Sequence, residues 1–167
     1  MLIRVENEND RDAVETIHAS AFESHTEAKL VGLLREQARP LIGLLAEEGV
    51  EGVGHILFSP ASLPGYPDMN IMGLAPMAVL PDYQGQGVGS ALVREGLQQC
   101  RDSGVDAVIV LGYPDYYTRF GFRPAAHYGI DSEYEVPEEA FMILELHPGA
   151  LQGCAGRVEY HPAFKQL

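Results

Sequence analysis

Two hydrophobic patterns divide the chain. Short, nearly continuous apolar runs are typical of buried strands, and apolar residues that recur every three or four positions are typical of amphipathic helices. The first pattern predicts strands over residues 2–6, 41–47, 53–59, 74–80, 107–111, 140–146 and 157–160. The second predicts helices from about residue 10 to 22, from Ser24 to before Pro40, and from about 87 to 103.

Several of these elements begin or end at a cap or turn signal. Asn9 or Asp10 is expected to cap the first helix, and Ser24-His25-Thr26-Glu27 has the form of a capping box at the second. Glu48-Gly49 joins two strands as a hairpin. Residues 124–139 are expected to form a long polar loop.

The strand over residues 74–80 contains Pro76. A proline cannot donate a hydrogen bond to a sheet, so it is confined to an edge or a bulge. Because the surrounding run is apolar and looks buried, we expect a bulge. The run 107–111 is apolar without interruption, which is typical of a strand covered on both faces. Strand, helix and strand in this order imply a right-handed parallel crossover.

Length, composition and charge narrow the class of protein. A chain of 167 residues is most simply one domain over residues 1–167, and 46% hydrophobic residues fit a globular protein. We expect it in the cytoplasm, because the sequence has no signal peptide, no membrane-length apolar run, and two widely spaced cysteines that fit reduced thiols. A net charge of −13 argues against a nucleic-acid partner. Such a negative charge would attract cationic molecules, although a role in keeping the protein soluble explains the charge equally well.

The most informative segment is Gln84-Gly85-Gln86-Gly87-Val88-Gly89-Ser90. It follows a predicted strand and opens a predicted helix, so several backbone N–H groups are left unpaired at the positive end of a helix. Glycines allow the backbone to approach an anion without a Cβ in the way. This arrangement predicts a binding site for a pyrophosphate.

Three kinds of glycine-rich loop compete for this segment. A P-loop requires Gly-Lys-Ser/Thr, and no lysine lies near. A dinucleotide loop requires a third glycine where Ser90 or Leu92 stands, depending on the frame. The remaining pattern is Gln-x-x-Gly-x-Gly, which Gln84, Gly87 and Gly89 match.

With this loop the chain resembles the GNAT superfamily of N-acetyltransferases. Two further segments support the resemblance, Met77-Ala78-Val79-Leu80-Pro81 before the loop and Tyr117 four residues before Gly121-Phe122. The ending of the chain from Leu146 is similar to a bacterial branch of predicted acetyltransferases. The resemblance implies an α/β (α+β) fold with a central, mixed, twisted sheet of six to seven strands flanked by about four helices.

The resemblance also implies acetyl-CoA as co-substrate, with no metal. It places the pyrophosphate on the backbone of the loop, with contacts from Gln84, Gly85, Gln86, Gly87, Val88, Gly89 and Ser90. The pantetheine arm would pair with the backbone of the bulged strand at Met77, Ala78 and Val79, as an added strand does. A backbone N–H of Met77 or Ala78 would face the thioester carbonyl.

The implied reaction is direct attack of an amine on the thioester. Tyr117 matches the family's tyrosine and is the candidate general acid, whereas Tyr116 is expected to pack. Many members also place an asparagine before this tyrosine, and this chain has none. No residue identifies itself as the general base, since Glu27 and His55 have simpler explanations as a cap residue and a core residue.

These features predict an N-acetyltransferase that transfers acetyl from acetyl-CoA to a primary amine of a small molecule or a protein. The alternative from another class is a non-catalytic acyl-CoA sensor. The acidic residues within 124–139 either line the acceptor site and favour a cationic amine or form a solvated loop. We expect no nucleic-acid or membrane partner, and a homodimer is one option because exposed strand edges in such folds often pair.

Overall fold

The computed structural model describes residues 1–167 and is built around one mixed sheet. The seven strands of this sheet lie in the order β1-β2-β3-β4-β5-β8-β6, and β7 and β9 form a separate pair. The strands are β1 (Leu2–Val5), β2 (Ile42–Glu48), β3 (Glu51–Ala61), β4 (Ile71–Val79), β5 (Ala107–Leu111), β6 (Arg123–Pro124), β7 (Ile130–Ser132), β8 (Phe141–Glu145) and β9 (Gly156–Val158). The predicted mixed sheet of six to seven strands is confirmed.

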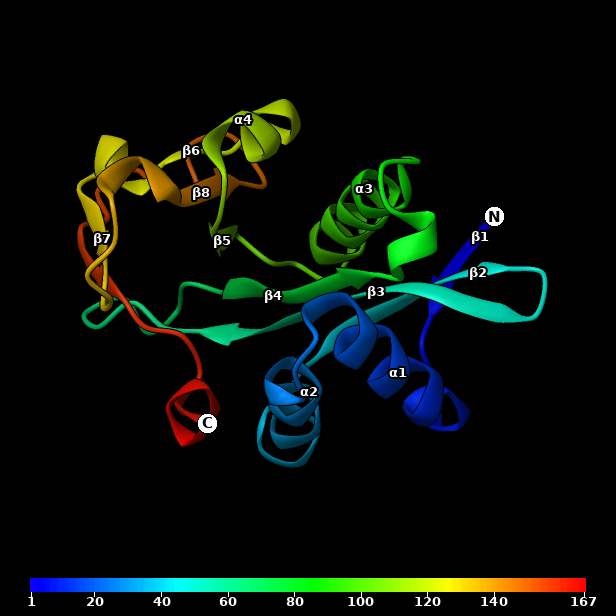
Figure 1. Ribbon diagram of the computed structural model, residues 1–167. Helices are drawn as coiled ribbons and strands as arrows, with labels where there is room; N and C mark the ends of the chain where they lie inside the picture. Colours follow the sequence, from blue (N-terminus) through cyan, green and yellow to red (C-terminus); the bar gives the residue numbers. More distant parts are fainter.

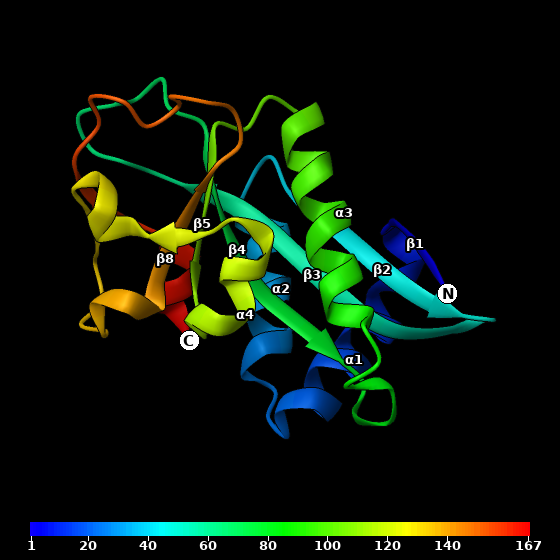
Figure 2. The same ribbon diagram turned by 90° about the horizontal axis from the view of Figure 1, so that it is seen from above.

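Four α-helices accompany the sheet. They are α1 (Arg11–Phe22), α2 (Thr26–Gln37), α3 (Val88–Asp102) and α4 (Pro114–Tyr117). Figure 1 shows α3 on one face of the sheet and α1 and α2 on the other, with the C-terminus on the side of α2. Seen from above, α3 crosses β2, β3 and β4, and α4 lies on the β5 side of it (Figure 2). No helix is both long enough and apolar enough to span a bilayer.

The core has separate apolar clusters on the two faces of the sheet. Residues of α3 such as Leu92, Val93 and Leu97 pack with Phe58 of β3 in one cluster. On the opposite face, Val14 and Ile17 of α1 pack in another cluster with residues from α2 and the sheet. The helical spacing of these apolar residues therefore indicates the buried face of each helix correctly.

The parallel crossover from β4 through α3 to β5 is confirmed. Its two strands pair over only three residues each, from Ile71 to Gly73 in β4 and from Ala107 to Ile109 in β5. Beyond these pairs the strands diverge, although β4 continues to Val79. The last six residues of β4 therefore have no neighbouring strand on the β5 side.

The expected bulge in β4 is confirmed next to this point of divergence. On β3, Ile56 and Phe58 are two positions apart, whereas their partners Met77 and Leu74 on β4 are three positions apart. One extra residue is thus accommodated in β4 between Leu74 and Met77, around Pro76. A bulge bends its strand and increases the local twist, which fits the separation of β4 from β5.

The two predicted helix caps are only partly correct: Asp10 is the N-cap residue of α1, as expected, but its side chain makes no capping hydrogen bond. Asn7, rather than Asn9 or Asp10, provides the side-chain cap, and it does so for a short 3-10 turn that precedes α1. The Asp10 carboxylate instead accepts from the Asn7 backbone N–H and from Arg4. At α2 the Ser24 hydroxyl accepts from the Thr26 N–H, so no capping box with Glu27 forms.

The predicted loop over residues 124–139 is also wrong. It contains the end of β6, two 3-10 turns and β7, and it buries Ala125 and Ile130 completely or nearly so. The last strand, β9, does not join the main sheet but pairs in parallel with β7. The sequence pattern predicted β9, over residues 157–160, but missed β6, β7 and the two 3-10 turns, because each is only two to four residues long.

Gly96 of α3 is required by the packing of Phe58. A Cβ built on Gly96 would lie 2.6 Å from the Phe58 ring carbon Cζ, well inside contact distance. We expect Gly96→Ala to lower the free energy of unfolding by about 1–3 kcal/mol, because overpacking forces the ring or the helix to move. Urea unfolding measures this change.

The matched control is Gly32→Ala on α2, where a Cβ would meet no atom within 4 Å. Relief of the helix penalty of glycine should make that variant more stable by up to about 1 kcal/mol. Equal effects of the two substitutions would contradict the packing argument.

Candidate functional site

The glycine-rich segment forms a closed loop between β4 and α3. Gly85 and Gly87 adopt φ angles of +72° and +88°, in the left-handed region that favours glycine. The Gln84 side chain donates from Nε2 to the Val79 carbonyl oxygen at 2.9 Å, and the Gln86 side chain donates likewise to Asp82. The two glutamines thus hold the loop against the segment before it. The backbone of the loop is then free to serve as an anion site at the start of α3.

A cleft of about 470 Å³ connects this loop to the free edge of β4. Nine of the ten residues predicted to hold the co-substrate line it, and Gln86 does not. The nine are Met77, Ala78, Val79, Gln84, Gly85, Gly87, Val88, Gly89 and Ser90. The cleft therefore joins a strand edge with free backbone groups to the N–H groups at a helix N-terminus.

Arg119 is a cleft residue that the sequence reasoning missed. Its Nη2 atom lies 3.2 Å from the Ser90 hydroxyl oxygen, and its guanidinium stacks over the Tyr116 ring at 4.4 Å from the centroid. It is the only cationic residue that lines the cleft. A chain of net charge −13 thus presents a positive group beside the glycine loop. The signal available in the sequence was an arginine three residues after Tyr116, one turn further along the same short helical segment.

The two neighbouring tyrosines of α4 occupy different environments. Tyr116 lines the cleft, and its hydroxyl lies 3.4 Å from the Ser90 hydroxyl. Tyr117 is 8% exposed, does not line the cleft, and packs edge-on against Phe122. A Cβ built on Gly112 would lie 2.9 Å from the Tyr117 ring carbon Cδ2 and would clash with the ring, so Gly112 is what allows this ring to approach the end of β5. Burial, with a smaller effect of Tyr116, raises the pKa of Tyr117 to about 12.

The candidates for a general base are scattered. Glu27 has one carboxylate oxygen, Oε2, that is buried without a hydrogen-bond partner. His55 is fully buried and bonded to His18. Among the acidic residues of 124–139, the Glu133 side chain is buried and its Oε1 accepts from the Tyr160 backbone N–H, whereas the other acidic residues are exposed. None of these side chains lines the cleft.

Comparisons with known proteins agree with this geometry. The model of the acetyltransferase (GNAT) domain family matches residues 3–125. The uncharacterized N-acetyltransferase YhbS of Escherichia coli (strain K12) is 42% identical over 169 residues, which cover 100% of both chains. A second E. coli K12 protein, the uncharacterized N-acetyltransferase YjhQ, is 42% identical over 81% of this chain and 77% of its own.

Two solved structures are similar over nearly the whole chain. The crystal structure of E. coli YhbS in complex with CoA has a TM-score of 0.92 at 40% identity and covers 98% of this chain and 91% of its own. A GNAT family acetyltransferase from Brucella melitensis in complex with acetyl-CoA has a TM-score of 0.80 at 34% identity, with 98% and 97% covered. This chain belongs to the GNAT acetyltransferase family. Within that family it is similar along its full length to YhbS, which agrees with the predicted bacterial branch.

The buried state of Tyr117 has a consequence for stability at high pH. Its raised pKa means that the unfolded chain loses this proton first, so the stability that Tyr117 contributes is intact below about pH 10 and is lost as the pH rises towards 12. We expect Tyr117→Phe to lose less unfolding free energy than the wild type between pH 9 and pH 11.5. Urea unfolding at a series of pH values measures the difference.

Tyr113→Phe is the matched control, because the Tyr113 side chain is 82% exposed. That variant should follow the wild-type pH dependence. If Tyr117→Phe also follows it, the Tyr117 hydroxyl is not in the buried environment described above.

Proposed function

We propose that this protein is an acetyl-CoA-dependent N-acetyltransferase that transfers an acetyl group to a primary amine in a ternary complex. The observation that carries the proposal is the cleft, which runs from the free edge of β4 to the glycine loop at the start of α3. The solved relatives bound to CoA and acetyl-CoA support the choice of co-substrate. The acceptor is a small-molecule or protein amine.

The residues of the cleft suit the two ends of acetyl-CoA. The N–H groups of residues 84–90 and the Arg119 guanidinium would hold the pyrophosphate, since both present positive charge at one place. The backbone of Met77 and the N–H of Val79 would hydrogen-bond the extended pantetheine arm, because β4 has no partner strand there and the Val79 carbonyl already accepts from Gln84. Acetyl-CoA supplies an activated acyl group and a good leaving group.

The protein's part in the transfer is to stabilise charge and to move protons. A backbone N–H of Met77 or Ala78, beside the bulge, would stabilise the oxyanion that forms when the neutral amine attacks. A phenol would then donate its proton to the departing thiolate, whose conjugate acid has a pKa of about 8.5. We assign this role to Tyr117, because it matches the family's tyrosine four residues before Gly121-Phe122 and its ring lies against Gly112 at the end of β5. Tyr116 is the competing donor, because it lines the cleft.

Calorimetric titration with acetyl-CoA, CoA and NADH tests the co-substrate. We expect micromolar binding of both CoA species and none of NADH.

Gly87→Arg should abolish CoA binding with the fold intact, because its side chain would occupy the anion position. Gly49→Arg is the matched control, since Gly49 also has a positive φ, +60°, but lies in the β2–β3 hairpin. Unchanged affinity in Gly87→Arg would mean that the loop does not hold the pyrophosphate.

Release of free thiol from acetyl-CoA, measured with a panel of primary amines, tests the reaction. Loss of a general acid costs about 10²-fold or more in rate, so Tyr117→Phe should lower kcat by that factor with little change in CoA affinity. Tyr116→Phe should instead alter the affinity for acetyl-CoA. If kcat falls in Tyr116→Phe but not in Tyr117→Phe, the general acid is Tyr116 instead. Tight CoA binding without turnover of any amine would favour the acyl-CoA sensor.

A further inference from the structure

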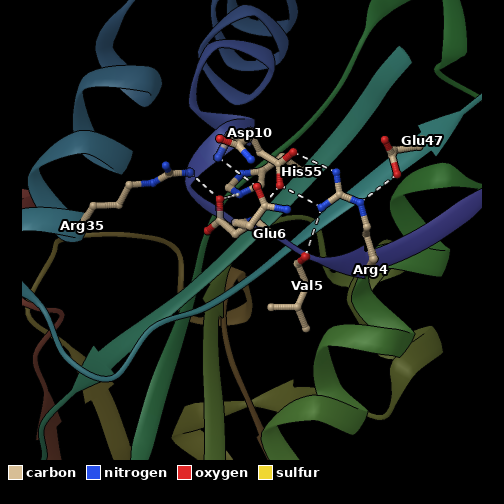
Figure 3. A network of polar contacts seen from close by, with 9 residues as sticks. Arg4, Val5, Glu6, Asp10, Arg35, Glu47 and His55 are labelled. Carbon is tan, nitrogen blue, oxygen red and sulfur yellow. Dashed lines mark hydrogen bonds and ion pairs between the residues drawn. The ribbon is translucent and has the colours of Figure 1, made fainter. Parts of the chain in front are cut away.

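A chain of buried polar side chains lies beneath β3, outside the cleft. Nε2 of His18 on α1 is 2.8 Å from Nδ1 of His55 on β3, and Nε2 of His55 is 3.2 Å from Oε2 of Glu6. Both imidazoles are fully buried. Figure 3 shows Glu6 lying between His55 and Arg35, whose Nη2 forms an ion pair with the same Glu6 oxygen.

The hydrogen bonds fix which nitrogens carry protons. Burial raises the pKa of Glu6, but the hydrogen bond from His55 and the charges of His55 and Arg35 outweigh it, so the net pKa is lowered and Glu6 is a carboxylate. A carboxylate only accepts, so His55 donates from Nε2 and, when neutral, accepts at Nδ1. His18 must then donate from Nε2, which leaves a lone pair on its Nδ1. That Nδ1 atom is buried and has no hydrogen-bond partner.

The same pair can accept one more proton without placing a charge on His18. A proton added to His18 Nδ1 allows the proton on His18 Nε2 to move to His55 Nδ1. His18 is then neutral in its other tautomer, and His55 is an imidazolium beside the Glu6 carboxylate. The charge rests on His55 because the Glu6 carboxylate lies 3.2 Å from its Nε2, whereas burial and the charges of His55 and Arg35 lower the pKa of His18.

This pair adjoins the cleft on two sides. The His18 ring stacks on Phe22, one helical turn further along α1, with centroids 6.2 Å apart and an interplanar angle of 7°. His55 is paired across the sheet with Ala78 of β4. Phe22 and Ala78 both line the cleft. The free lone pair therefore belongs to a side chain one residue layer away from the proposed reaction site.

We propose that His18 and His55 form a proton relay that takes up the proton of the acceptor ammonium, with Glu6 as the anion that holds the resulting charge. This rests on the proposed function, which needs a base that the cleft lacks. In the relay the ammonium N–H bond breaks, its electron pair stays on the amine nitrogen, and water that enters from the cleft carries the proton to His18 Nδ1. The His18 Nε2 proton passes to His55 Nδ1, so atoms and charge balance.

The charged groups around the relay favour a cation at His55. On the sheet side, Glu6 faces His55 directly, and Arg4 of β1 is neutralised by Asp10 and Glu47 at 2.8 Å each (Figure 3). Arg35 of α2 opposes the cation but is itself paired with Glu6. Removal of the Glu6 charge should therefore lower the proton affinity of the pair.

Nitrogen NMR of protein labelled with ¹⁵N-histidine and saturated with CoA tests the relay without any turnover. When the pH is lowered, we expect the pair to take up one proton in a single step, in which His18 changes from the Nε2–H to the Nδ1–H tautomer and remains neutral. In Glu6→Gln this step should move to lower pH, because the proton affinity of the histidine pair should be at least about tenfold lower than in the wild type. A His18 tautomer that stays constant, or a charge that resides on His18, overturns the relay.

The pH dependence of acetyl transfer tests whether catalysis uses the pair. Because the pair must be unprotonated to act as a base, Glu6→Gln should move the acidic limb of kcat to lower pH and reduce the plateau rate, with CoA affinity unchanged. Glu8→Gln, an exposed neighbour, is the matched control and should keep the wild-type limb. If the acidic limb of kcat lies at the same pH in Glu6→Gln as in Glu8→Gln, the pair is not used in catalysis, whatever the NMR result. Absence of turnover in the wild type, with the NMR step intact, would count against the proposed function and against the catalytic use, but not against the proton-accepting pair.

Discussion

The separation of β4 from β5 is the constraint on which the rest of the site depends. A parallel pair that stayed in register to its end would consume the backbone hydrogen bonds of both strands. Here pairing stops after three residues, next to a bulge that inserts one residue around Pro76. The free edge of β4 then leads directly to the glycine loop. A strand edge and a helix N-terminus thus become two ends of one cleft.

The charge of the cleft differs from that of the whole chain. The net charge of −13 would repel a phosphorylated ligand at long range. At short range, the loop N–H groups, the start of α3 and the Arg119 guanidinium provide a local positive region. Local anion binding can therefore coexist with a strongly acidic chain.

The buried histidine pair shows how polar groups in a core can be satisfied at one end only. His55 and Glu6 complete each other's hydrogen bonds, and Arg35 compensates the carboxylate. The same network leaves one nitrogen of His18 without a donor. Buried unsatisfied atoms are costly, and under the proposed function this nitrogen is the one that accepts a proton.

The sequence by itself determined the local features of this protein. Apolar periodicity located the long helices and strands, Pro76 indicated the bulge, and residues 84–90 indicated the anion loop, because each depends on contacts between near neighbours in the chain.

The sequence could not assign the caps correctly, because the Asp10 carboxylate bonds to Arg4 and the Ser24 hydroxyl bonds to Thr26. The last short strand, β9, was predicted from the apolar pattern, but β6 and β7 gave no periodic signal, because they are only two and three residues long and form by pairing with distant segments. Only the tertiary structure decided that Tyr116 lines the cleft while Tyr117 is buried, that Arg119 joins the loop, and that His18 meets His55 across 37 residues of sequence. Those side-chain positions follow from packing between elements, which no local pattern encodes.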